Sequence, residues 1–333
     1  MKKNTVKKLI SLTAAAAMVL LPLTGCTSSP AAGKTLKIGV IQYAPHPSLD
    51  NCYEGFVQGL ASAGYVDGQN IVIDFQNAQG EMNNSDTMAK NMTASGYDML
   101  VGIATPAAMS AYAAAKESGI PVIFSAVSDP VAAGIVESME NPNSGATGTS
   151  DALNLEGQIK LIRALLPEAK TIGILYTTSE PNSVSNLKAF RELAPLYGFE
   201  VAEQGITSPN EVATGAASLV SMGVDCINNF TDNNVVNNLS VLIHAADGAG
   251  IPVFGSEIEQ VKNGCVASEG LDYVALGVKT GQMAADILSG KADIKSMPVA
   301  VITDSEPVYS AINCEKFGIV IPDAYAAAKN VDE

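Results

Sequence analysis

Apolar runs and amphipathic stretches alternate along the chain from residue 36 onward. The runs are short and nearly continuous, which is typical of parallel strands buried on both faces, and the stretches between them carry apolar residues at helical spacing. A proline in the first turn marks the start of one of these helices, at 106. The pattern predicts strands at 36–43, 70–75, 98–104 and 121–127, and helices at 50–63, 82–95 and 106–118. Alternation of this kind indicates an α/β fold with helices on both faces of a parallel sheet.

The same order of features recurs about 134 residues later. Moved by that distance, Ile38 falls on Ile172, Pro47 on Pro181 and Gly64 on Gly198, with several further pairs in the same order. Each pair alone is weak, but their shared order indicates an internal repeat. We therefore predict two similar doubly wound lobes, the first beginning near residue 36 and the second near residue 153.

The first 26 residues have the layout of an export signal. Four lysines precede an uncharged apolar run at 9–21, which is shorter than the roughly 20 residues that a membrane-spanning helix needs. The run ends in Leu-Thr-Gly-Cys at 23–26, which resembles the lipobox of bacterial lipoproteins. An ordinary signal with a chance cysteine is the alternative. We expect a signal peptide at 1–25, a lipidated Cys26 anchoring the chain to the membrane, and a tether to residue 35.

Charge and composition narrow the classes of function. The chain has 333 residues and a formal charge of −15, or −19 without the four lysines of the leader, which argues against a nucleic-acid partner. Only two histidines, His46 and His244, are present, so a multi-histidine metal or catalytic centre is not expected. Cys226 and Cys265 lie in apolar runs, where a free thiol packs as a small hydrophobe, although an exported chain permits disulfides.

Polar side chains gather where the predicted strands end. In a parallel sheet these ends form one edge, and ligands bind there because helix N-termini point their free N–H groups at it. Two facing lobes would join their edges into a cleft. Candidate binding residues are Gln42, Tyr43, Pro47, Ser48, Thr105, Pro106, Ala107, Ser128, Asp129, Tyr176, Ser179, Glu180, Asn182, Ser183, Thr231, Asp232, Asn233, Ser256 and Glu257.

Several strings of residues carry a resemblance to a known family. They are IGVIQYAPHPSLD at 38–50, IATPAA at 103–108, SDPVAAG at 128–134, YTTSEPNS at 176–183, FTDNNV at 230–235, FGSE at 254–257 and GLDYVALG at 270–277. In this order the chain resembles substrate-binding lipoproteins of ABC importers, and within them the branch that binds tryptophan or tyrosine. The resemblance covers about residues 36–323.

The resemblance implies a fold, partners and lobe boundaries. The fold would be that of type I periplasmic binding proteins, with an ABC permease and its ATPase as partners. The chain would cross between lobes near 148–151, 271–273 and 303–307. Lobe one would be 36–150 plus 274–304 and lobe two 151–273 plus 305–333, joined by a three-segment hinge that opens and closes.

An amino acid ligand needs partners for both of its charges. Backbone N–H groups and hydroxyls at helix starts suit the carboxylate, and Thr105, Ala107, Asn182 and Ser183 are the candidates. A carboxylate suits the ammonium, and Asp232 is the first choice, ahead of Asp129 and Glu257. Helix capping is the alternative role of Asp232, and Asp129, which precedes a proline, has turn formation as its alternative.

An aromatic ligand also needs apolar and stacking partners. Tyr43, Tyr176, Phe124 and Phe230 lie at or near the relevant strand ends, although the two phenylalanines equally suit the core. His46, between two prolines, is expected at the rim, where a neutral imidazole would stack on the ligand or hydrogen-bond to it. Gln42 is a candidate for ligand contact or for fixing the loop.

No motif for catalysis is present in the sequence, including the nucleophile elbow, the P-loop and the zinc-protease helix. We expect no cofactor, no metal, no enzymatic activity and a monomer. The alternatives to amino acid transport are a receptor for a membrane sensor and a binding protein for a branched-chain amino acid, a nucleoside or a short peptide.

Overall fold

Six parallel strands form the first of three sheets. The computed structural model describes residues 35–302 and 305–333. The first sheet has the order β11-β5-β4-β3-β1-β2, and all its neighbouring pairs are parallel. Its strands are β1 (Leu36–Gln42), β2 (Ile71–Asn77), β3 (Met99–Ile103), β4 (Val122–Ser125), β5 (Ala146–Ser150) and β11 (Ala300–Val301).

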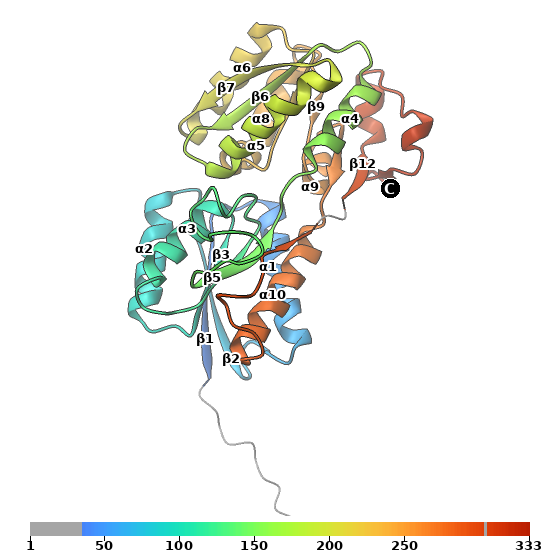
Figure 1. The fold of residues 1–333 in the computed structure, drawn as a ribbon. Helices are drawn as coiled ribbons and strands as arrows, with labels where there is room; N and C mark the ends of the chain where they lie inside the picture. The colour runs from blue at the N-terminus through green and yellow to red at the C-terminus, as the bar shows by residue number, and fades with distance from the viewer. Residues whose placement is uncertain (1–34, 303–304) are drawn as a thin grey trace, which may run out of the picture. The chain divides into compact units, whose positions relative to one another are not determined.

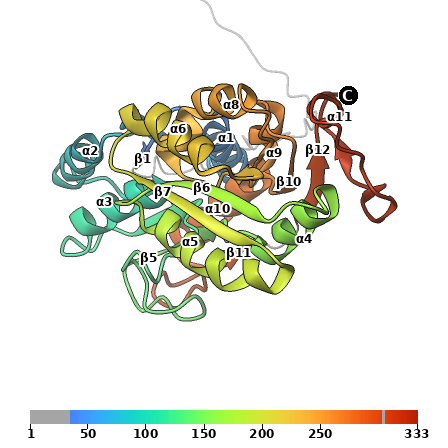
Figure 2. The same ribbon diagram turned by 90° about the horizontal axis from the view of Figure 1, so that it is seen from above.

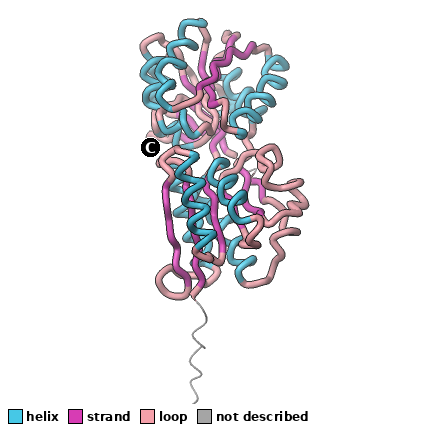
Figure 3. Tube along the Cα trace, turned by 90° about the vertical axis from the view of Figure 1, so that its left-hand side faces the viewer, coloured by secondary structure: helices cyan, strands magenta, loops and turns pink. Residues whose placement is uncertain are grey.

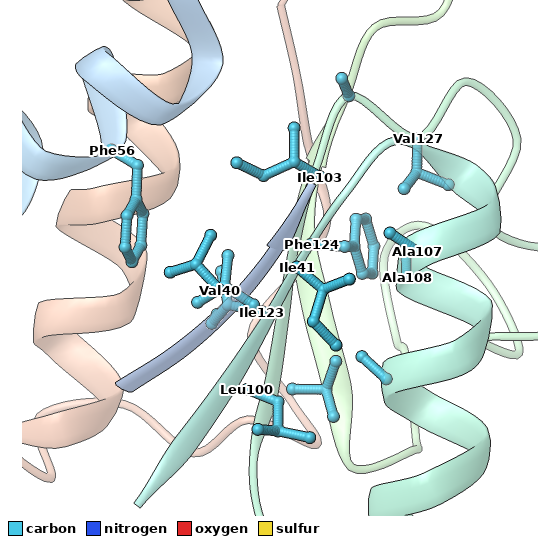
Figure 4. Close-up of a cluster of buried hydrophobic side chains, with 14 of the residues drawn as sticks. Val40, Ile41, Phe56, Leu100, Ile103, Ala107, Ala108, Ile123, Phe124 and Val127 are labelled. Carbon is cyan, nitrogen blue, oxygen red and sulfur yellow. The ribbon is translucent and has the colours of Figure 1, made fainter. Parts of the chain in front are cut away.

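Helices cover both faces of this sheet, as Figures 1 and 3 show. On one face lie α1 (Pro47–Ser62) and α10 (Tyr273–Leu288), and on the other α2 (Met82–Ala94) and α3 (Thr105–Ala115). We call this sheet with its four helices the first lobe. Its core includes Val40, Phe56 and Phe124, which have no exposed surface, and Figure 4 shows them between the strands and the helices.

The second sheet repeats the topology of the first. Its order is β7-β6-β8-β9, all parallel, which corresponds to β2-β1-β3-β4 in the first lobe. Ile38 pairs with Ile73 and Ile172 with Val201, so the predicted repeat places equivalent residues at equivalent sheet positions. The strands are β6 (Thr171–Thr177), β7 (Glu200–Ile206), β8 (Cys226–Asn228) and β9 (Val253–Phe254).

A third, smaller sheet shares buried cores with the second. Its strands are β10 (Ala267–Gly270), β12 (Glu306–Tyr309) and β13 (Lys329–Asn330). We call the second and third sheets with their helices the second lobe, and Figure 2 shows strands β6 and β7 between its helices. The helices are α4 (Leu155–Leu165), α5 (Pro181–Leu193), α6 (Val212–Met222), α7 (Asn233–Asn237), α8 (Leu239–Asp247), α9 (Ile258–Lys262) and α11 (Ala311–Lys316), with 3-10 turns η1 (Ala194–Tyr197), η2 (Pro209–Glu211) and η3 (Asp323–Tyr325).

Two helix and strand boundaries differ from the predicted ones because of the backbone conformation that a single residue adopts. The first helix begins at Pro47, three residues earlier than predicted, because proline suits the first helical turn. Strand β4 ends at Ser125 because Ala126 has a φ of 57°, which no strand residue adopts.

Two further sequence expectations concern the thiols and the aromatic residues. Cys52, Cys226, Cys265 and Cys314 are all buried free thiols, as predicted for Cys226 and Cys265. Phe124 and Phe230 lie in the cores of the two lobes, so the packing alternative holds for both.

Some predictions fall outside the described residues. They are the signal peptide, Cys26 with most of its tether, and part of the third crossing, at 303–304. Of the helices in the part of the chain that the structure describes, none is long and apolar enough to cross a membrane.

Glycines let helices α1 and α10 approach to backbone contact. A β-carbon at Gly55 would lie 2.1 Å from the carbonyl oxygen of Val274, and one at Gly277 would lie 2.2 Å from that of Cys52. Gly59 and Gly281 repeat this arrangement one turn further along. Both helices thus carry Gly-x-x-x-Gly on the facing side, and the contact leaves no room for any side chain.

We predict that Gly277→Ala destabilises the protein by about 1–3 kcal/mol, because the added methyl group forces two packed backbones apart. Thermal unfolding followed by circular dichroism measures the change. Gly145→Ala is the matched control, because its β-carbon meets nothing within 4 Å and its backbone does not have a positive φ. Equal melting temperatures for the two variants would contradict the close approach.

Candidate functional site

A cavity lies where the strands of both lobes end. It encloses about 320 Å³ of space that no protein atom fills, part of it open to solvent. Its walls come from the loops after β1, β3, β4 and β5 and from the starts of helices in the second lobe. It is lined by His46, Ser48, Leu49, Ala104, Thr105, Ala126, Ser128, Asp151, Asn182, Thr231, Asn233, Val236, Glu257, Gln260 and Tyr273.

Two lining residues hold the backbone in a conformation that favours glycine. Ala104, which follows β3, has a φ of 76°, and Ala126, which follows β4, has a φ of 57°. Non-glycine residues in this region cost of the order of 1 kcal/mol, and such strain is concentrated at functional sites. Both alanines turn the chain sharply at the cavity wall.

Polar atoms without partners converge on the cavity. The imidazole Nδ1 of His46, the hydroxyls of Thr105 and Thr231, and the amide oxygen of Asn182 are buried, and none has a hydrogen-bond partner within the protein. A buried polar atom left unpaired costs about 1–3 kcal/mol. Several of them around one space indicate that a polar ligand completes their hydrogen bonds.

Three helices begin at or beside the cavity without a side-chain cap. Helices α1, α3 and α5 each have a proline in the first turn, and no side chain accepts a hydrogen bond from their first N–H groups. Helices α7, α9 and α10 also begin at the cavity, and these are capped by Asp232, Glu257 and Asp272. Free N–H groups at a helix start attract an anion such as a carboxylate.

A buried carboxyl group lines the same cavity. Asp151 follows β5, and its two oxygens accept hydrogen bonds from the hydroxyls of Ser128 at 2.9 Å and Tyr273 at 2.7 Å. Burial raises the pKa of Asp151. Among the described residues that line the cavity there is no lysine or arginine, so a cationic group on a ligand would meet a carboxyl group without a competing positive charge.

Other carboxyl groups near the site are occupied by the protein itself. Asp232 accepts hydrogen bonds from the backbone N–H and hydroxyl of Thr177, the hydroxyl of Ser183 and the N–H of Val235. It caps α7, which is the alternative role considered for it, and does not line the cavity. Glu257 lines the cavity but uses both oxygens to cap α9.

Burial also raises the pKa of two glutamates. That of Glu180 rises to about 8, with the nearby charge of Asp232 as a second cause, and that of Glu257 to about 7. Glu180 accepts hydrogen bonds from the backbone and side-chain amides of Asn233, at 3.1 and 2.7 Å.

A few hydrogen bonds join the lobes beside the cavity. The hydroxyl of Ser185 donates to Asp129 at 2.5 Å, and the amide of Asn51 donates to Glu259 at 3.3 Å. Asp129, a candidate ligand contact, also accepts from the N–H of Ala132, so it shapes its own turn as well.

Of the residues predicted from the sequence, some line the cavity and others do not. Those at the cavity are Ser48, Thr105, Ser128, Asn182, Thr231, Asn233 and Glu257, together with His46 from the expected rim. Those that do not line it are Gln42, Tyr43, Pro47, Pro106, Ala107, Asp129, Tyr176, Ser179, Glu180, Ser183, Asp232 and Ser256. Gln42 fixes its loop, since its amide donates to the carbonyl of Ala44 and to Asp50.

The residues that sequence reasoning missed come from two sources. Leu49, Val236 and Gln260 lie in the first turns of helices whose starts were considered. Asp151 and Tyr273 lie where the chain was expected to cross between lobes, and a crossing beside a cleft necessarily borders it. The expected crossings between lobes could therefore have identified Asp151 and Tyr273 as cavity residues. Within residues 35–302 and 305–333, no three His, Cys, Asp or Glu side chains are grouped to hold a metal ion.

Comparison with known proteins supports a binding role. Residues 37–331 match the model of a family described as ABC transporter substrate binding protein. The tyrosine-binding protein of Clostridioides difficile (strain R20291) is 37% identical over 311 residues, which are 90% of this chain and 89% of that protein.

Two solved structures of binding proteins are also similar to this chain. An ABC domain from Streptococcus pneumoniae in complex with L-Trp is 36% identical, covers 89% of this chain and 98% of its own, and has a TM-score of 0.85. A ligand-free, open substrate-binding protein with adhesive properties from Clostridium difficile is 39% identical, covers 89% and 99%, and has a TM-score of 0.67.

We predict that the ligand-free protein loses stability as the pH rises from about 5 to 8. Folded Glu180 and Glu257 keep their protons up to about pH 8 and 7, whereas in the unfolded chain both are ionised above about pH 5. Their contribution is therefore full at low pH and is lost as the pH rises through the folded pKa values. Melting temperatures across this range measure it.

Glu180→Gln is the control for this pH dependence. The amide cannot ionise and keeps a polar group at the position, so the variant should show a flatter decline between pH 5 and 8 than the wild type. A decline of the same slope in the variant would show that Glu180 is not its source.

Proposed function

The chain belongs to the family of ABC transporter substrate-binding proteins, and we propose that it captures an aromatic amino acid, tryptophan or tyrosine foremost, in the cavity between its lobes. Proteins of this family work outside the cytoplasm and deliver a small molecule to a membrane permease. One observation carries the proposal: the cavity pairs a buried carboxyl group with uncapped helix N-termini, and these are the partners that the two charges of a free amino acid need.

Asp151 is the proposed partner of the ligand ammonium. Each of its oxygens accepts one hydroxyl and keeps a lone pair, whereas the two oxygens of Asp232 accept four hydrogen bonds and do not line the cavity. Glu257 directs both oxygens at the first N–H groups of α9. This assignment replaces the preference for Asp232 that the sequence suggested. Asp151 is also buried, so its attraction to an ammonium is screened little by water.

We propose that the starts of α3 and α5 bind the carboxylate of the ligand. Thr105 and Asn182 line the cavity there, in the first turns of two helices that no side chain caps. The unpartnered Thr105 hydroxyl is available to donate to the carboxylate beside the free N–H groups.

Apolar walls suit the side chain of the ligand. Leu49, Val236 and the ring of Tyr273 line the same cavity. The relative from Streptococcus pneumoniae has L-Trp bound, and the curated relative is described as tyrosine-binding, which favours an aromatic ligand over a branched-chain one, a nucleoside or a short peptide.

Binding is proposed to close the lobes about a three-segment hinge. The protein is more similar to the L-Trp complex than to the open, ligand-free relative, with TM-scores of 0.85 and 0.67 at nearly equal identity. The proposed lobe boundaries are 36–150 plus 274–304 and 151–273 plus 305–333. In agreement with them, β5 and α10 belong to the first lobe, while α4 and β12 belong to the second.

We also propose how the protein treats its ligand and how it is held at the membrane. The protein binds its ligand without transforming it, needs no cofactor and acts as a monomer that delivers to an ABC permease and its ATPase. A signal peptide directs its export, and lipidated Cys26 anchors it to the cell membrane. The lipobox-like string before Cys26 supports the anchor.

We predict measurable heat of binding for L-Trp or L-Tyr and a loss of at least about tenfold in affinity in Asp151→Asn, because the amide removes the charge facing a buried ammonium. Isothermal titration calorimetry with the twenty amino acids tests both statements. Asp272→Asn is the control, because this neighbouring carboxyl group caps α10 and does not line the cavity.

Two results would contradict the assignments in this experiment. If none of the twenty amino acids binds the wild type, the ligand class is wrong, and a sensor receptor or a nucleoside-binding protein becomes the better candidate. If Asp151→Asn binds as tightly as Asp272→Asn, the ammonium lies elsewhere.

We predict that Cys26→Ser releases the protein from the membrane fraction, because a serine cannot carry the thioether-linked lipid. Detergent phase partitioning of the wild type and the variant, expressed in a bacterium that processes lipoproteins, measures the change. A variant that stays in the detergent phase would disprove this anchor.

A further inference from the structure

His46 lies at the cavity wall with one ring nitrogen unused. The residue precedes α1 and is 7% exposed, and its Nδ1 has no hydrogen-bond partner. Its neighbours Pro45 and Pro47 have no backbone N–H, so neither can satisfy Nδ1. The other ring nitrogen, Nε2, lies 3.5 Å from the amide oxygen of Asn233 in the second lobe.

The orientation of Asn233 decides which nitrogen of His46 carries the hydrogen. Its amide nitrogen donates to Glu180 at 2.7 Å, so its oxygen must be the atom that faces the imidazole. An oxygen that accepts there requires a hydrogen on Nε2, which leaves Nδ1 as a bare acceptor. Burial lowers the pKa of His46 to about 4, so the ring stays neutral at physiological pH.

The position of His46 shows which part of a ligand it meets. His46 and Val236 line the main cavity and also a neighbouring one of about 590 Å³, so they mark the end where the two adjoin. Asp151, Ser128 and Ala126 line the main cavity alone. With the ammonium at Asp151, the His46 end receives the side chain of the amino acid.

We infer that Nδ1 of His46 accepts a hydrogen bond from the side chain of the ligand, an indole N–H or a phenol O–H, and so selects tryptophan or tyrosine over phenylalanine. This inference rests on the proposed function and adds a specificity-determining residue to it. A ligand without the donor leaves a buried acceptor unpaired, and sites built to hydrogen-bond a ligand group discriminate strongly against analogues that lack it.

Matched ligand pairs test the inference by calorimetry. L-Tyr is compared with L-Phe, and L-Trp with 3-benzothienyl-L-alanine, in which sulfur replaces the indole N–H with little change of shape. For whichever parent binds the wild type, the analogue without the donor should bind at least about tenfold more weakly.

Two variants of His46 separate the acceptor from the rest of the ring. His46→Asn keeps an oxygen near the position of Nδ1 and should retain the preference for the parent ligand. His46→Gln keeps an amide donor toward Asn233 but lacks the acceptor, so its preference should fall below about threefold. Circular dichroism melts of both variants check that they fold.

A measurement on the wild type keeps the test independent of the variants. Only two histidines are present, so nitrogen NMR of the ring, with His244→Gln for assignment, reports the state of His46 directly. We expect the Nε2–H tautomer and a shift of the Nδ1 resonance on adding the parent ligand but not its analogue.

The outcomes distinguish a failure of the inference about His46 from a failure of the proposed function. If both members of a pair bind equally well, if His46→Gln keeps the preference, or if His46 is the Nδ1–H tautomer, the inference about His46 is overturned while aromatic amino acid binding stands. If no aromatic amino acid binds the wild type, the proposed function is overturned and the inference falls with it.

Discussion

The buried carboxyl group of Asp151 is the constraint on which the site depends. It lies directly after β5, where the chain leaves the first sheet, and it accepts a hydrogen bond from Tyr273, where the chain returns. One carboxyl group therefore ties two chain crossings together. The ionised carboxyl group accepts hydrogen bonds from hydroxyls, and no lysine or arginine is among the described residues that line the cavity. An ammonium group of a ligand would therefore supply the missing positive charge, at a point beside two segments of the proposed hinge.

Several carboxyl groups in and near the cavity are costly to ionise because they are buried. Burial raises the pKa of Asp151, Glu180, Asp232 and Glu257 alike, and each of these groups is stabilised by neutral donors only in part. A ligand ammonium at Asp151 would favour the ionised form of that carboxyl group in the proposed closed state, and much less in an open, hydrated one. Differential binding of this kind is what shifts a two-state equilibrium toward closure.

The sequence predicted the fold and part of the cavity lining for physical reasons that also explain the misses. Strand periodicity and the internal repeat indicate which strand ends lie at the same edge of each sheet. Ser48, Thr105 and Asn182, which line the cavity, could therefore be predicted from the sequence alone. Asp232 looked equally suitable, but its four donors depend on how α5 and α7 pack, which no local pattern records. Asp151 was missed as a cavity residue because it is held there by a hydrogen bond from a residue 122 positions away.

The glycine contact between α1 and α10 connects this site to the stability of the first lobe. The start of α1 follows His46 and carries Ser48 and Leu49, and the start of α10 is Tyr273, so both helices present cavity residues at their first turns. Because the two helices are in backbone contact at Gly55 and Gly277, they cannot move closer together. His46, which is proposed to contact the ligand side chain, and Tyr273, which donates to Asp151, are therefore held in fixed relative positions before the ligand binds. This lowers the entropy that binding loses in ordering the site.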